Sequence, residues 1–131
     1  MFAPDTRILV ADDAVSMRMT IINHLKSLGF TNFVEAPNGN AAFQLMEAAP
    51  EPFQLVLSDQ NMPECTGLEF LRRVRATEKF KTTPFIMITS ETEKAIVVQA
   101  VQSGANNYVS KPVTAEALKG KLEATFARLP K

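Results

Sequence analysis

The feature that most constrains the fold is the alternation of five short apolar runs with longer segments of helical periodicity. The apolar runs span residues 8–11, 33–36, 55–58, 85–89 and 108–110. Several are apolar at every position, as in Leu55-Val56-Leu57 and Phe85-Ile86-Met87-Ile88. Strands of this kind are buried on both faces, which is typical of a parallel sheet covered by helices. The sequence therefore predicts a parallel sheet of five strands, several of them buried on both faces.

The segments between these runs carry apolar residues three or four positions apart, which is the spacing of one helix face. The five stripes are Met17, Ile21, Leu25 and Leu28; Ala42, Leu45, Met46 and Ala49; Leu68, Leu71 and Val74; Val97, Ala100 and Val101; and Leu118, Leu122, Phe126 and Leu129. Gly29 is expected as a left-handed stop after the first helix, and Thr114 as the N-cap of the last. Ser90-x-x-Glu93 predicts a capping box before the fourth helix.

Five strands alternating with five helices indicate a doubly wound α/β sheet, with five parallel strands flanked by five helices. The chain has 131 residues, a length typical of one domain, so we expect a single domain over residues 1–131. A closed barrel of eight strands needs about 200 residues or more and is excluded by length.

Charge and composition exclude several classes of protein. Fourteen basic residues balance fourteen acidic ones, which removes the broad positive field expected of a nucleic-acid binder. No apolar run reaches the ~18 residues of a membrane span, and the first residues lack the pattern of a secretion signal. Cys65 is the single cysteine, which fits a reducing compartment. We therefore expect a cytoplasmic protein without nucleic-acid or membrane partners, and we expect it to be a monomer.

Polar residues follow four of the five predicted strands at the point where each strand ends. These strand ends are Asp12-Asp13, Ser58-Asp59, Thr89-Ser90 and Ser110-Lys111-Pro112. In an open parallel sheet the carboxyl ends of the strands share one edge, where ligands bind. An acidic pair after a strand is by itself as often a solvated loop, and Lys-Pro is usually only a turn. Four such placements together predict a functional site.

Electrostatics indicates what this site binds. Two carboxylates ~4 Å apart repel each other by roughly 4 kcal/mol at an effective dielectric constant near 20, so three of them require cations. Lys111 supplies one positive charge, and a divalent ion would complete the balance. An all-oxygen site suits Mg²⁺ or Mn²⁺, and His24 and Cys65 are too few to favour zinc. A metal, an ammonium and a hydroxyl around a carboxylate suit an incoming phosphoryl group, and no glycine-rich loop for a nucleotide exists.

The sequence resembles response-regulator receiver domains over essentially its whole length. The motifs that carry the resemblance are Val10-Ala11-Asp12-Asp13, Ser58-Asp59-Gln60-Asn61-Met62-Pro63, Ile88-Thr89-Ser90 and Val109-Ser110-Lys111-Pro112. The resemblance implies the flavodoxin-like strand order 2-1-3-4-5, for which a chemotaxis receiver is a known example. It also implies a cis bond between Lys111 and Pro112. We expect a signalling module that catalyses only its own phosphoryl transfer and autodephosphorylation.

The resemblance implies a role for each site residue. Asp59 would accept the phosphoryl group from the phosphohistidine of a histidine kinase. Asp13, Asp59 and the backbone carbonyl of Asn61 would bind Mg²⁺ directly, and Asp12 would act mainly through a bound water. Lys111 would contact the acyl phosphate.

Three further residues would govern switching and the lifetime of the phosphoryl group. Thr89 would swing its hydroxyl onto the phosphoryl group, and Tyr108 would be the switch aromatic, although it could instead only fill space at the sheet edge. Asn61 and Glu91 match positions that modulate loss of the phosphoryl group.

Within the family, the chain is most similar to the stand-alone chemotaxis receivers. We expect no effector domain, so that output is a protein contact, most simply with the flagellar motor switch, and a phosphatase is a further expected partner. Three residues depart from that pattern: Gln60 replaces an aromatic, Thr66 replaces an acid, and Val113 replaces an aromatic on the expected partner face.

Two alternatives remain open. The first is a phosphorelay intermediate or phosphate sink, which would exchange phosphoryl groups without touching a motor. The second is a small Mg²⁺-dependent phosphohydrolase, which needs a second acid near the nucleophile and a cap over the substrate. The residue two positions after Asp59 is Asn61, and the chain has no room for a cap.

Overall fold

The computed structural model describes residues 2–90 and 93–130. Its elements are β1 (Ile8–Ala11), α1 (Val15–Ser27), β2 (Phe33–Ala36), α2 (Gly39–Ala48), β3 (Leu55–Asp59), α3 (Gly67–Ala76), the 3₁₀ turn η1 (Glu78–Phe80), β4 (Phe85–Ser90), α4 (Lys94–Gln102), β5 (Asn107–Lys111) and α5 (Ala115–Ala127). The five strands form one sheet in the order β2-β1-β3-β4-β5, and every neighbouring pair is parallel. The predicted doubly wound α/β fold and its strand order are therefore confirmed.

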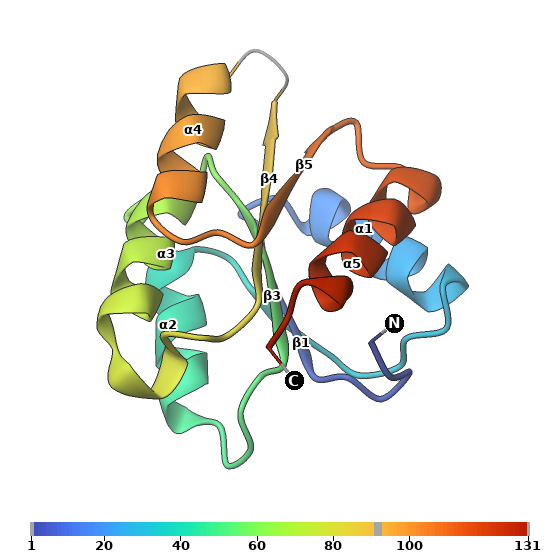
Figure 1. Ribbon diagram of the computed structural model, residues 1–131, viewed down its shortest axis with the longest axis horizontal. Coiled ribbons are helices and arrows are strands. Elements are labelled where there is room, and N and C mark those ends of the chain that lie inside the picture. The colour runs from blue at the N-terminus through green and yellow to red at the C-terminus, as the bar shows by residue number, and fades with distance from the viewer. Residues whose placement is uncertain (1, 91–92, 131) are drawn as a thin grey trace.

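Helices cover both faces of this sheet, as Figure 1 shows, with α2, α3 and α4 on one side and α1 and α5 on the other. Alternate residues of each strand point to opposite faces. Leu9, Val56 and Met87 accordingly join the cluster beneath α2, α3 and α4. Val10, Leu57 and Ile88 join the cluster beneath α1 and α5. All six side chains are fully buried, which explains why β1 and the first parts of β3 and β4 are apolar at every position. The outer strands β2 and β5 carry polar residues and are mostly half-buried.

Helix ends are defined by capping residues and by a glycine in the left-handed conformation. Gly29 has a φ of +99°, as expected of a left-handed residue after α1. The Thr114 hydroxyl accepts a hydrogen bond from the backbone N–H of Ala117, so Thr114 is the N-cap of α5. Thr66 and Glu69 form a capping box at the start of α3, which the sequence analysis did not predict.

The predicted capping box at Ser90 and Glu93 is wrong. Helix α4 begins at Lys94 with Glu93 as its N-cap residue, and the Glu93 side chain makes no capping hydrogen bond. Its carboxylate instead accepts hydrogen bonds from two side chains of the site described below. The apolar stripe of α4 is also less buried than its periodicity predicts, because Val101 is 55% exposed and only Ala100 of the three residues is buried.

Among the described residues, no helix is both long and apolar enough to cross a membrane.

Candidate functional site

Three carboxylates meet at the carboxyl edge of the sheet. Asp12 and Asp13 follow β1, and Asp59 is the last residue of β3, the strand that pairs with β1. One carboxylate oxygen from each residue lies within 4.8 Å of the other two. Asp12 and Asp59 are buried, whereas Asp13 is exposed to solvent. The parallel register therefore assembles the cluster that the strand ends predicted.

Asp59 lies against the one cation of the predicted site. The Nζ atom of Lys111, at the end of β5, is 2.8 Å from Oδ1 of Asp59. Burial raises the pKa of the Asp59 carboxyl, while the hydrogen bond and positive charge of Lys111 lower it. Lys111 thus compensates the burial of one carboxylate but leaves two further acids beside it. The bond between Lys111 and Pro112 is cis, as the resemblance implied.

Asp12 is buried and only half satisfied. Its Oδ1 atom accepts a hydrogen bond from the backbone N–H of Ala14 at 2.9 Å. Its Oδ2 atom is buried and has no hydrogen-bond partner among the residues that the structure describes. Burial raises the pKa of Asp12 to about 6, and the negative charges of Asp59 and Asp13 add to that effect.

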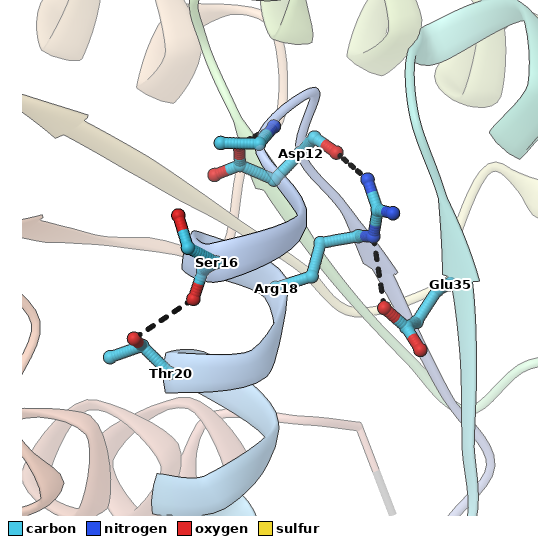
Figure 2. A network of polar contacts seen from close by, with 6 residues as sticks. Asp12, Ser16, Arg18, Thr20 and Glu35 are labelled. Atoms are coloured by element: carbon cyan, nitrogen blue, oxygen red, sulfur yellow. Dashed lines mark hydrogen bonds and ion pairs between the residues drawn. The ribbon is translucent and has the colours of Figure 1, made fainter.

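An arginine fixes the turn that carries these acids, as Figure 2 shows. Arg18 of α1 donates from Nη1 to the carbonyl oxygen of Asp12, and its Nε lies 2.9 Å from Oε1 of Glu35 on β2. In the same view, the Thr20 hydroxyl donates to the carbonyl oxygen of Ser16 at 3.0 Å, a local bond within α1. Arg18 therefore ties the β1–α1 turn to the neighbouring strand, and its charge is paired with Glu35.

The donor set fits a hard divalent cation. Three carboxylates offer oxygen ligands at close range, and a buried carboxylate oxygen of Asp12 has no hydrogen-bond partner in the described part of the chain. Oxygen ligands with both buried and solvent-facing members suit Mg²⁺, which keeps several waters and one or two carboxylates. The acidic cluster can therefore hold a metal ion.

A second polar group lies beside the carboxylates. The buried Thr89 hydroxyl on β4 donates to Oε2 of Glu93 at 2.8 Å. The side-chain amide of Asn61, after β3, donates to Oε1 of the same carboxylate at 2.8 Å. Thr89 and Asn61 were predicted as residues of the site, whereas Glu93 was predicted only as part of a helix cap. Glu91, predicted as a modulating residue, lies outside the described residues.

Tyr108 of β5 lies at the rim of a surface groove. Its side chain is half-buried, and Nζ of Lys121 on α5 lies 4.2 Å from the ring centroid, a cation–π contact. The groove has a volume of about 500 Å³ and runs between α4 and β5, lined by Ser90, Lys94, Val97, Val98, Tyr108 and Ser110. The predicted switch aromatic is therefore accessible from the surface and adjoins a recess.

The three departures from the chemotaxis pattern have structural explanations. Gln60 is buried, and its Oε1 atom accepts a hydrogen bond from the backbone N–H of Leu68 at 2.8 Å, at the start of α3. Thr66 caps the same helix. The expectation that Val113 lies on a partner face is wrong, because Val113 is only 7% exposed and packs in the cluster beneath α1 and α5. The β5–α5 turn directs its side chain inward, so its identity bears on the core.

Comparison with known proteins agrees with this geometry. The family described as "Response regulator receiver domain" matches residues 8–123. The chain is 42% identical over 123 residues to the chemotaxis protein CheY of Pseudomonas aeruginosa, covering 94% of this chain and 98% of that protein. It is 43% identical over 120 residues to CheY1 of Helicobacter pylori, covering 92% and 96% of the two chains. The structure of the chemotaxis response regulator CheY4 of Vibrio cholerae is similar with a TM-score of 0.81 at 30% identity, covering 92% and 98%. The chain therefore belongs to the response regulator receiver domain family.

Proposed function

We propose that this protein is a cytoplasmic chemotaxis response regulator that accepts a phosphoryl group on Asp59 and then binds the flagellar motor switch. The observation that carries the proposal is the placement of the Asp59 carboxylate, which is buried, 2.8 Å from the Lys111 ammonium and within 4.8 Å of two further carboxylates. The likeness to CheY proteins over most of the chain supports a chemotaxis output in particular.

The chemistry assigned to Asp59 is nucleophilic. A carboxylate oxygen of Asp59 attacks the phosphorus of a kinase phosphohistidine, the P–N bond breaks, and the imidazole leaves with the bonding electron pair. Lys111 then faces the new acyl phosphate with its ammonium group and balances part of its charge. The Thr89 hydroxyl donates to a phosphoryl oxygen. Tyr108, the switch aromatic, responds to the new position of that hydroxyl and so alters the surface groove that it lines.

Asp12, Asp13 and Asp59, with the backbone carbonyl of Asn61, are the residues that would hold Mg²⁺. Bound there, the ion supplies positive charge for the transferring phosphoryl oxygens. The chain's own contribution is to gather the acids at one edge of the sheet.

The test uses beryllofluoride, which stands in for the phosphoryl group on Asp59. The wild-type protein should bind the N-terminal peptide of a flagellar motor switch protein only when beryllofluoride and Mg²⁺ are both present. The Asp59→Asn variant should fold, should take up no label from a small acyl phosphate, and should bind no peptide under either condition.

The possible results separate the two parts of the proposal. Full labelling of Asp59→Asn would contradict the acceptor assignment. Labelling of the wild type at Asp59 without peptide binding would contradict the motor-switch output and would favour a phosphorelay or phosphate-sink role.

A further inference from the structure

Glu93 joins two residues of the site through one carboxylate. Its Oε2 atom accepts a hydrogen bond from the Thr89 hydroxyl, and its Oε1 atom accepts one from the Asn61 side-chain amide, each at 2.8 Å. Each oxygen thus takes one donor, and the two donors come from β4 and from the loop after β3. Hydrogen bonds to an ionised acceptor are stronger than those between neutral groups. The Asn61 and Thr89 hydrogen bonds hold the pKa of Glu93 below its usual value.

The Glu93 side chain does not serve its own helix. Glu93 is the N-cap residue of α4, and a side chain at that position usually accepts from the first free backbone N–H groups of the helix. Here the side chain makes no such bond, although the Glu93 carbonyl accepts from Ile96 and Val97 in the ordinary way. The orientation of the carboxylate is therefore explained by the site and not by helix capping.

The bond to Thr89 matters because a hydroxyl carries a single proton. Thr89 is buried, and it donates that proton to Glu93. If the Thr89 hydroxyl is to donate to a group on Asp59, its bond to Glu93 must first break. Glu93 also holds a negative charge that interacts with Lys111, the cation that faces Asp59. A phosphoryl group would therefore compete with Glu93 both for the hydrogen bond from the Thr89 hydroxyl and for electrostatic interaction with the Lys111 ammonium.

We propose that Glu93 is a positioning residue that holds the unphosphorylated state, by bridging Thr89 and Asn61 until a phosphoryl group displaces its carboxylate. This inference rests on the proposed function, because it requires a phosphoryl group on Asp59. Glu93 sets how readily the site closes around that group, and it does not take part in the transfer itself.

The experiment is a calorimetric titration of the full chain with beryllofluoride at saturating Mg²⁺. Glu93→Ala removes both hydrogen bonds and the charge, and we expect its half-saturating concentration to fall about tenfold below that of the wild type. Glu93→Gln removes the charge but keeps one acceptor oxygen, so its value should lie between the other two. Glu123→Gln, an exposed carboxylate on α5, is the matched control and should behave as the wild type.

A double-mutant cycle with Thr89→Ala distinguishes this positioning role of Glu93 from a merely structural one. If Glu93 acts through the Thr89 proton, removing Glu93 in the Thr89→Ala background should change the half-saturating concentration much less than in the wild type. An equal effect in both backgrounds, or no effect of Glu93→Ala in the wild type, would overturn the inference. Failure of the wild type itself to bind beryllofluoride would instead count against the proposed function.

Discussion

At the scale of single residues, the buried carboxyl of Asp12 makes the stability of the metal-free protein depend on pH. Its pKa is about 6 in the folded protein and 3.8 in an ordinary environment. The folded state therefore binds a proton at a pH where the unfolded chain does not, and acidification favours folding. Between pH 7 and pH 5 the free energy of unfolding should rise by about 1 kcal/mol from this group, and the gain should be complete below pH 3.8.

The measurement is urea denaturation of the wild type and of Asp12→Asn at pH 7 and pH 5, with a chelator present. The amide of the variant cannot titrate, so its stability should change less between the two pH values. An identical pH response in both proteins would show that Asp12 is not the group responsible.

Most of the residues that lie together in the candidate site could be predicted from the sequence, for a reason that is specific to this architecture. Parallel strands end at one edge, so Asp12, Asp59 and Lys111 could be placed together without knowledge of their distances. Glu93 and Lys121 could not be assigned in the same way. Glu93 is the N-cap residue of α4 and Lys121 lies on α5, and what their side chains contact depends on how each helix is oriented on the sheet. The periodicity of a helix does not specify that orientation.

At the scale of elements, the start of α3 is pressed against the acceptor strand. Gly67 is the first residue of α3, and a Cβ atom there would lie 2.3 Å from the carbonyl oxygen of Asp59 and 2.8 Å from Sδ of Met87. The Asp59 carbonyl belongs to the backbone of a buried strand and cannot move aside cheaply. We expect Gly67→Ala to lower the free energy of unfolding by about 2 kcal/mol or more.

Gly120 provides the matched control for this substitution. It lies within α5, and a Cβ atom there would meet nothing within 4 Å. Because alanine is the better helix former, Gly120→Ala should raise stability by about 0.5–1 kcal/mol. Thermal denaturation of both variants tests the pair. A Gly67→Ala protein as stable as the wild type would show that the close approach of α3 to β3 is not required.

The strands were easier to predict than the helix contacts. β1 and β2 have the predicted limits, whereas β3, β4 and β5 each extend one residue further at the carboxyl end, to Asp59, Ser90 and Lys111. β5 also begins one residue earlier than predicted, at Asn107. Backbone pairing continues through polar residues, which hydropathy alone reads as the end of a strand. The exposure of Val98 and Val101 on α4 had no such signal, because periodicity defines an apolar face without showing what covers it.

At the scale of the whole molecule, the sheet lies between two helix layers, α2, α3 and α4 on one face and α1 and α5 on the other, and the candidate site lies at its carboxyl edge. The termini close one of these layers, where the rings of Phe2 and Phe126 meet edge to face with centroids 5.1 Å apart. The acids lie in another part of the fold, at the carboxyl ends of β1 and β3. Asp59 is far from Asp12 and Asp13 in the sequence and meets them only when β1 and β3 pair, so binding of a cation to the three acids is coupled to folding.

Mg²⁺ should therefore stabilise the entire protein. At a concentration ten times its dissociation constant, an ion that binds only the folded state adds about 1.4 kcal/mol to the free energy of unfolding, which raises the melting temperature by several degrees. The measurement is calorimetric melting at pH 7.5 with MgCl₂ or with NaCl of equal ionic strength, since general screening also weakens repulsion between carboxylates. Asp13→Asn should fold normally, because Asp13 is exposed, and should lose most of the Mg²⁺ effect. Equal melting temperatures in the two salts, or an undiminished Mg²⁺ effect in Asp13→Asn, would contradict a metal site formed by the clustered acids.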